Sequence, residues 1–126
     1  MELVYDKPYN VIAIETPSTD GDLFTFFTED EEGKVIRVAV TIGKSGSQIY
    51  AWTAALTECV NMLLDEGTSL SEISIRLSNI YTDRIRLSSE LHTIRSGPDG
   101  FVHSINKYLR RKNRQYRPPF DMFWSG

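Results

Sequence analysis

The hydrophobic positions in the first third of the chain follow a strand pattern. Three apolar segments, residues 11–14, 23–28 and 35–42, are rich in β-branched and aromatic side chains and are bounded by polar, proline or glycine residues. The intervening stretch 29–34 reads Glu-Asp-Glu-Glu-Gly-Lys, a composition typical of a hairpin turn. We therefore expect an antiparallel meander. The four carboxylates at 29–32 could form a cation site, but such a run at a turn more often lies in solvent.

From residue 47 onward, the apolar positions recur at helical spacing. Ser47 is a plausible N-cap and Gly67 a stop signal. The apolar side chains between them would cover the sheet with one face of a helix: Ile49, Trp52, Leu56, Cys59, Val60 and Leu63.

Two more helices are expected after Gly67. Ser69 and Glu72 have capping-box spacing, and a second, shorter apolar face extends from Leu70 to Ile80. The third helix should begin after Ser96-Gly97, with Pro98 at its first position. Its buried residues should be Phe101, Ile105, Tyr108 and Leu109. The fold class is thus α+β, a strand meander in the N-terminal half packed against two to three helices.

Length and composition are consistent with one domain over residues 1–126. With 40% hydrophobic and 11% aromatic residues, the chain can build a core without a disulfide or a metal. Cys59 is the single cysteine, which excludes an internal disulfide and a cysteine-based zinc cluster. Its position on the apolar helix face predicts a buried, inert thiol. We recognise neither a signal peptide nor a membrane-spanning run, so a soluble intracellular protein without a cofactor is the expectation.

Charge is distributed unevenly along the chain. Six of the fourteen Lys and Arg residues lie between positions 107 and 117, a segment without Asp or Glu, whereas the rest of the chain has eight basic and seventeen acidic residues. Such a basic strip indicates a site for an anion, although basic residues are also common at a helix C-terminus. Arg110 and Arg114 are four residues apart and should share one helix face.

A second anion site is possible where the third strand meets the first helix. Residues 42–47 read Ile-Gly-Lys-Ser-Gly-Ser and imitate a phosphate-binding loop, with Lys44, Ser45 and Ser47 as its polar side chains. A true P-loop has a glycine five residues before Gly43, where this chain has Val38, which argues against nucleotide hydrolysis. A tight turn that needs two glycines explains the pattern equally well.

The irregular segment 81–95 carries further basic and aromatic side chains. Arg84, Arg86 and Arg95 could add positive charge to a site, and Tyr81 could stack on a base. The two histidines, His92 and His103, have no sequence neighbours that suggest a triad or a metal cage. These residues favour binding over catalysis.

Several of these features resemble the TSCPD domain found at the C-terminus of vitamin-B12-dependent ribonucleotide reductases. The resemblance covers roughly residues 10–110 and lies in Ile14-Glu15-Thr16-Pro17, the acidic hairpin, the 42–47 turn and the helix that follows it. The motif that names the domain corresponds to Arg95-Ser96-Gly97-Pro98-Asp99, in which Gly97 replaces the family's cysteine. The loss of that cysteine argues against an inherited redox or metal role.

A TSCPD-like domain of this length with a basic C-terminal helix is similar to the phage Thoeris anti-defence proteins. That resemblance implies a protein of the host bacterial cytoplasm that binds and holds cyclic ADP-ribose isomers without cleaving them. It also implies homodimers or hexamers with pockets between protomers, and separate sites for cyclic di- or trinucleotide signals of CBASS systems. By position and type, Tyr81 would stack on the adenine and Arg110 and Arg114 would grip the pyrophosphate, while Arg84 and Arg95 add charge.

Two other function classes are open from the sequence. A nucleic-acid-binding accessory or anti-restriction module would use the basic strip to contact backbone phosphates, although the acidic remainder of the chain would repel a duplex. A small enzyme of ribonucleotide metabolism would show turnover. For the cyclic di- and trinucleotides that the resemblance implies, the candidate site is the 43–47 turn.

Overall fold

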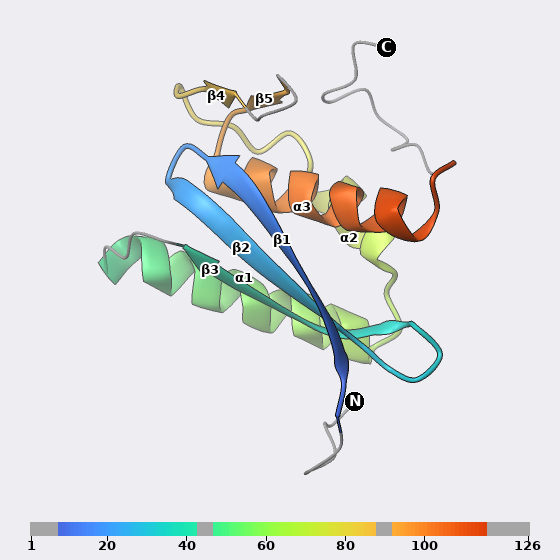
Figure 1. Ribbon diagram of the computed structural model, residues 1–126. Helices are drawn as coiled ribbons and strands as arrows, with labels where there is room; N and C mark the ends of the chain where they lie inside the picture. The colour runs from blue at the N-terminus through green and yellow to red at the C-terminus, as the bar shows by residue number, and fades with distance from the viewer. Residues whose placement is uncertain (1–7, 43–46, 88–91, 116–126) are drawn as a thin grey trace.

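The computed structural model describes residues 8–42, 47–87 and 92–115, apart from the side chains of residues 47–50. An antiparallel sheet in the order β1-β2-β3 is formed by β1 (Asn10–Ser18), β2 (Gly21–Glu29) and β3 (Val35–Ile42). The helices α1 (Ser47–Asp65), α2 (Leu70–Leu77) and α3 (Gly97–Lys112) follow, and a short ribbon of β4 (Arg86–Leu87) and β5 (Thr93–Ile94) lies between the last two (Figure 1). The predicted α+β arrangement is confirmed.

The sheet is longer than the apolar segments predict. β1 continues through Pro17 to Ser18, because it is an edge strand and proline needs no ladder partner on its open side. A tight turn joins β1 to β2, with Ser18 paired to Gly21, whose φ of +126° favours glycine. A register shift after Thr28 lets both Val35 and Ile36 at the start of β3 become buried.

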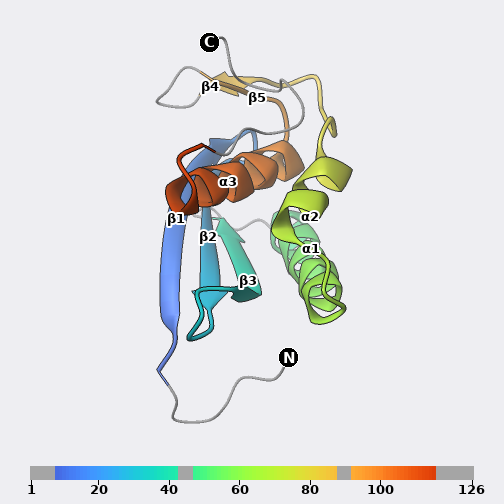
Figure 2. The ribbon, with the colours of Figure 1, turned by 90° about the vertical axis from the view of Figure 1, so that its right-hand side faces the viewer.

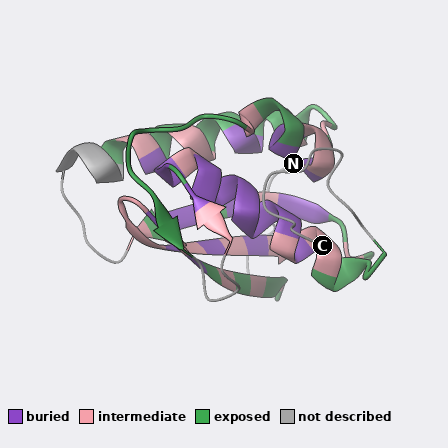
Figure 3. Cartoon of the chain, turned by 90° about the horizontal axis from the view of Figure 1, so that it is seen from above, coloured by how far each residue is buried: buried purple, intermediate pink, exposed green. Residues whose placement is uncertain are grey.

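The helices lie over one face of the sheet and beside its β3 edge. α3 crosses β1 and β2, α1 runs along β3, and α2 packs against α3 (Figure 2). The core forms where these elements meet, around Leu23, Phe27, Phe101 and Ile105, none of which is exposed. In Figure 3 the buried stretch of α3 lies at the centre of the molecule. Tyr108 is 2% exposed, as the sequence predicts for a core residue.

The buried face of α1 differs from the one predicted. The side chain of Asn61 is 5% exposed and closes the open edge of β3: its Oδ1 accepts the Val38 N–H at 2.8 Å, and its Nδ2 donates to the Val38 carbonyl at 3.0 Å. This pairing turns Thr53 and Val60 inward and leaves Leu63 40% exposed. A polar residue thus fixes the rotation of the helix, which hydrophobic spacing alone cannot reveal.

Cys59 is exposed, so the prediction of a buried thiol is wrong. Its position follows from the same rotation of α1 about the Asn61 contact. The predicted second helix is also shorter: α2 ends at Leu77, and Ile80 lies beyond it with 45% of its surface exposed. None of the helices in the described residues combines the length and hydrophobicity needed to cross a membrane.

Candidate functional site

The Ser-Gly-Pro-Asp sequence at residues 96–99 builds the start of α3. Ser96 is the N-cap, and its Oγ accepts the N–H of Asp99 at 2.9 Å. Asp99 Oδ2 in turn accepts the N–H of Arg95 at 2.9 Å. Ser96 thus caps the helix, whereas Asp99 reaches one residue past the N-cap, so the two side chains satisfy two backbone donors at the helix start in a variant of the capping box. The Ser, Pro and Asp of the motif therefore have a structural role in this chain.

Gly97, at the cysteine position of the motif, has no room for a side chain. A Cβ atom there would lie 2.3 Å from Cζ2 of Trp52 and 2.7 Å from a carboxylate oxygen of Asp20. Trp52 comes from α1 and Asp20 from the β1–β2 turn, so three separate parts of the chain meet at this point. The indole of Trp52 takes the space that a cysteine would need.

A buried carboxylate and a buried imidazole lie next to each other in the first turns of α3. Asp99 and His103 are each 2% exposed, and Asp99 Oδ1 lies 3.8 Å from His103 Nε2. Burial raises the pKa of Asp99, although the hydrogen bond from the Arg95 N–H opposes this. Burial, together with the nearby charges of His92 and Lys107, lowers the pKa of His103 to about 3. His103 is therefore neutral at physiological pH.

The segment between α2 and α3 places Tyr81 and Arg95 together. Thr82 donates to the Arg95 carbonyl from its N–H at 2.9 Å and from its hydroxyl at 2.8 Å, which joins the two ends of the segment. The guanidinium carbon of Arg95 lies 5.4 Å from the centroid of the Tyr81 ring, within cation–π range. The Tyr81 hydroxyl donates to Asn79 Oδ1 at 2.8 Å. The ring is 44% exposed and thus accessible to a ligand.

Arg84 and Arg86 line a cavity of about 410 Å³ together with Ser18, Thr19, Gly21 and Ile85. Arg86 is engaged there, because its Nη2 lies 2.8 Å from Asp22 Oδ1 and its Nη1 donates to the Ser18 carbonyl at 3.1 Å. Arg84 is exposed and its guanidinium has no contact within the described residues. We call Tyr81, Arg84, Arg86 and Arg95 the ribbon end of the molecule.

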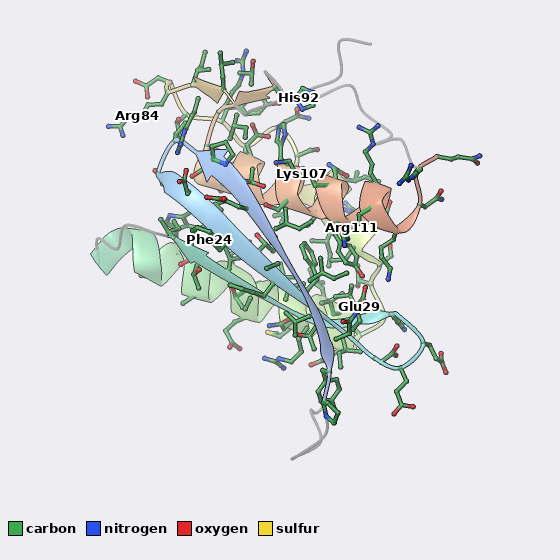
Figure 4. The ribbon with its side chains drawn as sticks, in the orientation of Figure 1. Phe24, Glu29, Arg84, His92, Lys107 and Arg111 are labelled. Carbon is green, nitrogen blue, oxygen red and sulfur yellow. The ribbon has the colours of Figure 1, made fainter. Side chains whose placement is uncertain are left out.

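Arg110 and Arg114 lie at the other end of α3. Arg110 is half-buried in the last turns of the helix and Arg114 is exposed just beyond it. About fourteen residues separate Arg110 from the N-cap, which corresponds to roughly 20 Å along the helix axis. Figure 4 shows Arg84 and Arg111 at opposite ends of the molecule. One chain therefore does not bring Tyr81 together with Arg110 and Arg114.

Two lysines of the basic strip contact oxygen atoms of the same chain through their ammonium groups. Lys112 Nζ lies 2.8 Å from Glu29 Oε2, and Lys107 Nζ is 3.4 Å from the carbonyl oxygen of Glu15. The strip is therefore less positive than its composition suggests. Arg110, Arg111 and Arg114 are its guanidinium groups within the described residues, and Arg110 and Arg114 each have an interaction partner as well.

Glu29, which the sequence places in a solvated acidic turn, is instead 2% exposed. Asn10 donates to its Oε1 at 2.8 Å, and the Tyr108 hydroxyl and Lys112 contact its Oε2. Burial raises the pKa of this carboxyl, but the ammonium and the two hydrogen-bond donors outweigh that effect and hold it below its usual value. Burial and the Glu29 contact raise the pKa of Tyr108.

The strand alternation could have revealed this buried carboxylate. Leu23, Thr25 and Phe27 are the inward positions of β2, and Glu29 continues the same period of two. Tyr108 also stacks on Phe27, with ring centroids 4.3 Å apart, so the network is tied directly to the core.

The predicted second anion site lies largely outside the described residues. Lys44 and Ser45 belong to the undescribed segment 43–46, and Ser47 is the first residue of α1, with its side chain also outside the description. Across residues 8–42, 47–87 and 92–115, no cluster of three or more His, Cys, Asp or Glu side chains is arranged to hold a metal ion.

The chain belongs to the TSCPD domain family, whose model matches residues 7–111. This match includes the sheet, the three helices and the capping motif of α3. Comparisons with curated proteins and with solved structures gave no match.

Proposed function

We propose that this protein binds and sequesters cyclic ADP-ribose immune signals without cleaving them, as an anti-defence protein of a phage acting in the host cytoplasm. The observation that carries the proposal is the ribbon end: an exposed tyrosine stacked by Arg95 and, three residues along the same segment, Arg84, which lines a cavity without an ion-pair partner in the described residues. An adenine can stack on such a ring, and guanidinium groups match the geometry of phosphate oxygens.

Arg110 and Arg114 contribute to the same ligand only if it lies between two protomers, because they are at the opposite end of α3 from Tyr81. In our proposal the ribbon end of one subunit faces the C-terminal end of α3 of its partner. Tyr81 holds the adenine, Arg110 and Arg114 of the partner subunit hold the pyrophosphate, and Arg84 and Arg95 supply further charge. Enclosure between subunits favours slow release, which sequestration requires.

Among the described residues, the sheet face opposite the helices offers a second surface for assembly, distinct from the contact that encloses the ligand because α3 lies on the other face of the sheet. Phe24 and Phe26 of β2 point away from the helices and are half-buried, and Phe26 lies between the exposed Ala13 and Ala39 of the neighbouring strands. Phe24 can be seen at the sheet in Figure 4. Apolar residues of this size on an outer sheet face favour packing against another sheet.

The charged residues of this face could pair with the opposite charges on the same face of a second copy. Glu15 and Arg37 occupy diagonally opposite corners, since Glu15 pairs with Phe24 whereas Arg37 pairs with Thr28. Neither makes an ion pair within the described residues. A two-fold axis along the other diagonal would place Glu15 opposite Arg37 of the partner subunit, twice per dimer, with the two sheets crossing near a right angle.

Cyclic di- and trinucleotides are the second ligand class in the proposal, held in a separate site near Lys44, Ser45 and Ser47. Assembly beyond the dimer, to a hexamer, would be compatible with two distinct sites. The same binding experiments, carried out with cyclic oligonucleotides, test this part separately.

A nucleic-acid-binding module is the alternative. The pairing of Lys112 with Glu29 reduces the charge available to a phosphate backbone. Several phosphate contacts would make the affinity fall steeply with salt, whereas one enclosed ligand should be much less sensitive. A salt titration with a short duplex and with a single strand separates the two.

Ligand recovery tests the proposal directly. The protein is incubated with cyclic ADP-ribose isomers, its melting temperature is measured, and the ligand is released by denaturation and identified by mass spectrometry. Binding raises the melting temperature by mass action. Intact ligand supports sequestration, altered ligand identifies an enzyme, and the absence of a shift with every isomer refutes the proposal.

A further inference from the structure

A second, apolar cavity of about 310 Å³ opens at the end of the molecule opposite the ribbon. It lies where the β2–β3 turn, the α1–α2 turn and the last turns of α3 meet. Its lining residues are Gly33, Lys34, Val35, Leu64, Gly67, Thr68, Ser69, Leu70, Tyr108, Leu109 and Lys112. The volume is at the lower end of the range for small-molecule pockets.

The walls of this cavity are continuous with the hydrophobic core. Val35 is 9% and Leu70 7% exposed, and Leu64 and Leu109 pack against the same core cluster. These four side chains come from β3, α2, α1 and α3, so every layer of the fold contributes to the walls. An occupant with an apolar body would remove these walls from water, which is the main source of affinity in such a site.

The rim of the cavity is cationic. Lys112 is fixed there because its Nζ contacts the buried Glu29, while 41% of its side chain stays exposed. Lys34 is exposed, and its ammonium has no partner within the described residues. Lys34 and Lys112 are the charged side chains among the described lining residues, and no carboxylate lines the cavity. Glu29, the partner of Lys112, and Asp30, whose Oδ1 accepts the Lys34 N–H at 2.9 Å, lie behind the rim. Asp30 and Glu31 line a different cavity, with Pro8, Tyr9, Asn10, Glu29 and Gly33.

We propose that this cavity binds a small amphipathic monoanion, a medium-chain carboxylate, with its hydrocarbon chain between the leucines and its carboxylate at Lys34 and Lys112. The combination of apolar walls with two ammonium groups and no carboxylate among the described lining residues favours this class of ligand. The site shares none of the residues assigned to cyclic nucleotide binding, so the two proposals stand or fall separately.

The chain length of the ligand provides the first test. The full-length protein is titrated by calorimetry with hexanoate, octanoate and decanoate, each below its micelle concentration, and with octanol. Each added pair of methylene groups should tighten binding about tenfold until the cavity is full. Octanol should bind several-fold more weakly than octanoate. Affinity without chain-length dependence, or no binding of any probe, overturns the proposal.

Two variants locate the bound ligand. Thr68→Trp places a large side chain at the mouth and should abolish octanoate binding, whereas Lys34→Gln should weaken octanoate several-fold and leave octanol unchanged. Arg76→Gln is the matched control, because Arg76 lies on α2 outside the cavity and should have no effect. Equal octanoate affinity in Lys34→Gln and the wild type would refute the site even if Thr68→Trp failed to fold.

Discussion

The indole ring of Trp52 occupies the space that any side chain at position 97 would need. A Cβ atom at Gly97 would come within 2.3 Å of Cζ2 of Trp52, and the same position carries cysteine in the motif that names the TSCPD domain. The tryptophan at position 52 therefore requires a glycine at position 97. The structural part of the motif, the capping-box variant of Ser96 and Asp99, remains in place around them.

Restoring the cysteine should destabilise the protein. Gly97→Cys forces Trp52 to move, and overpacking of this kind costs about 1–3 kcal/mol of unfolding free energy. The double variant Gly97→Cys with Trp52→Ala should lose less than the sum of the two single changes, because the tryptophan no longer opposes the new side chain. Urea denaturation of the four proteins measures this coupling, and strict additivity would contradict the account.

Loss of the α3 cap should also lower stability. Ser96→Ala removes the acceptor for the Asp99 N–H at a buried helix start, with an expected cost of about 1–2 kcal/mol. Ser96→Thr keeps the hydroxyl and serves as the matched variant. If Ser96→Ala unfolds at the wild-type urea concentration, the motif has a different role from the structural one assigned to it.

The buried carboxylate at the other end of α3 is expected to stabilise the fold. Glu29→Gln should lower the free energy of unfolding by about 1–3 kcal/mol, since it removes the charge that Lys112 and the Tyr108 hydroxyl contact. Glu32→Gln, in the same turn but exposed, should have almost no effect. Because the pKa of Glu29 is depressed in the fold, its contribution is present above the unfolded-state pKa and is lost as the pH falls through the lower folded value.

His103 should make the protein less stable as the pH falls. Its pKa is lowered to about 3 by burial, so between the ordinary histidine value of 6.5 and about 3 the unfolded chain takes up a proton that the native state does not. One such proton changes the unfolding free energy by about 1.4 kcal/mol per pH unit. Asp99 acts in the opposite direction, since its pKa is raised and protonation in the fold favours the native state at low pH.

The variant His103→Gln isolates this contribution. The difference in unfolding free energy between wild type and variant, measured from pH 7 to pH 5, should decrease toward low pH. A difference that is independent of pH over this window would show that His103 takes up its proton in the folded protein as readily as in the unfolded chain, and would contradict the lowered pKa.

Much of the fold could be predicted from local patterns. The three strands, the capping serine at 69 and the core position of Tyr108 follow from alternation, cap spacing and helical periodicity. What could not be predicted depends on contacts between distant segments. Asn61 fixes the rotation of α1 by pairing with Val38, which exposes Cys59. The alternation along β2 places Glu29 on the inward face, but it does not reveal that Asn10 and Tyr108 meet it there.

The candidate site shows the same division. The basic and aromatic residues can be identified in the sequence, but it does not show which of them lie near the start of α3 and which lie near its end. Only the fold reveals that Tyr81 and Arg95 stack at one end while Arg110 and Arg114 lie at the other. Periodicity places residues on a helix face and carries no information on which end of another element they approach.

The proposed contact between outer sheet faces can be tested separately. Phe26→Glu should break this contact and halve the number of subunits in the assembly, because it places a charge at the centre of the apolar face. The single reversals Glu15→Arg and Arg37→Glu should each weaken association, and the double reversal should restore it. Sedimentation velocity distinguishes these species. An unchanged oligomeric state in Phe26→Glu would show that the outer sheet face is not an interface.

The most direct measurement of the central claim is complementation between two defective subunits. Tyr81→Ala and the double variant Arg110→Ala with Arg114→Ala are each prepared alone, and are also coexpressed with different tags and isolated as the mixed dimer. Calorimetric titration with the cyclic ADP-ribose isomer that the wild type binds gives the stoichiometry. The account predicts that each variant alone binds weakly, whereas the mixed dimer recovers one full-affinity site, half the wild-type number. A mixed dimer that binds no better than either variant alone would contradict it.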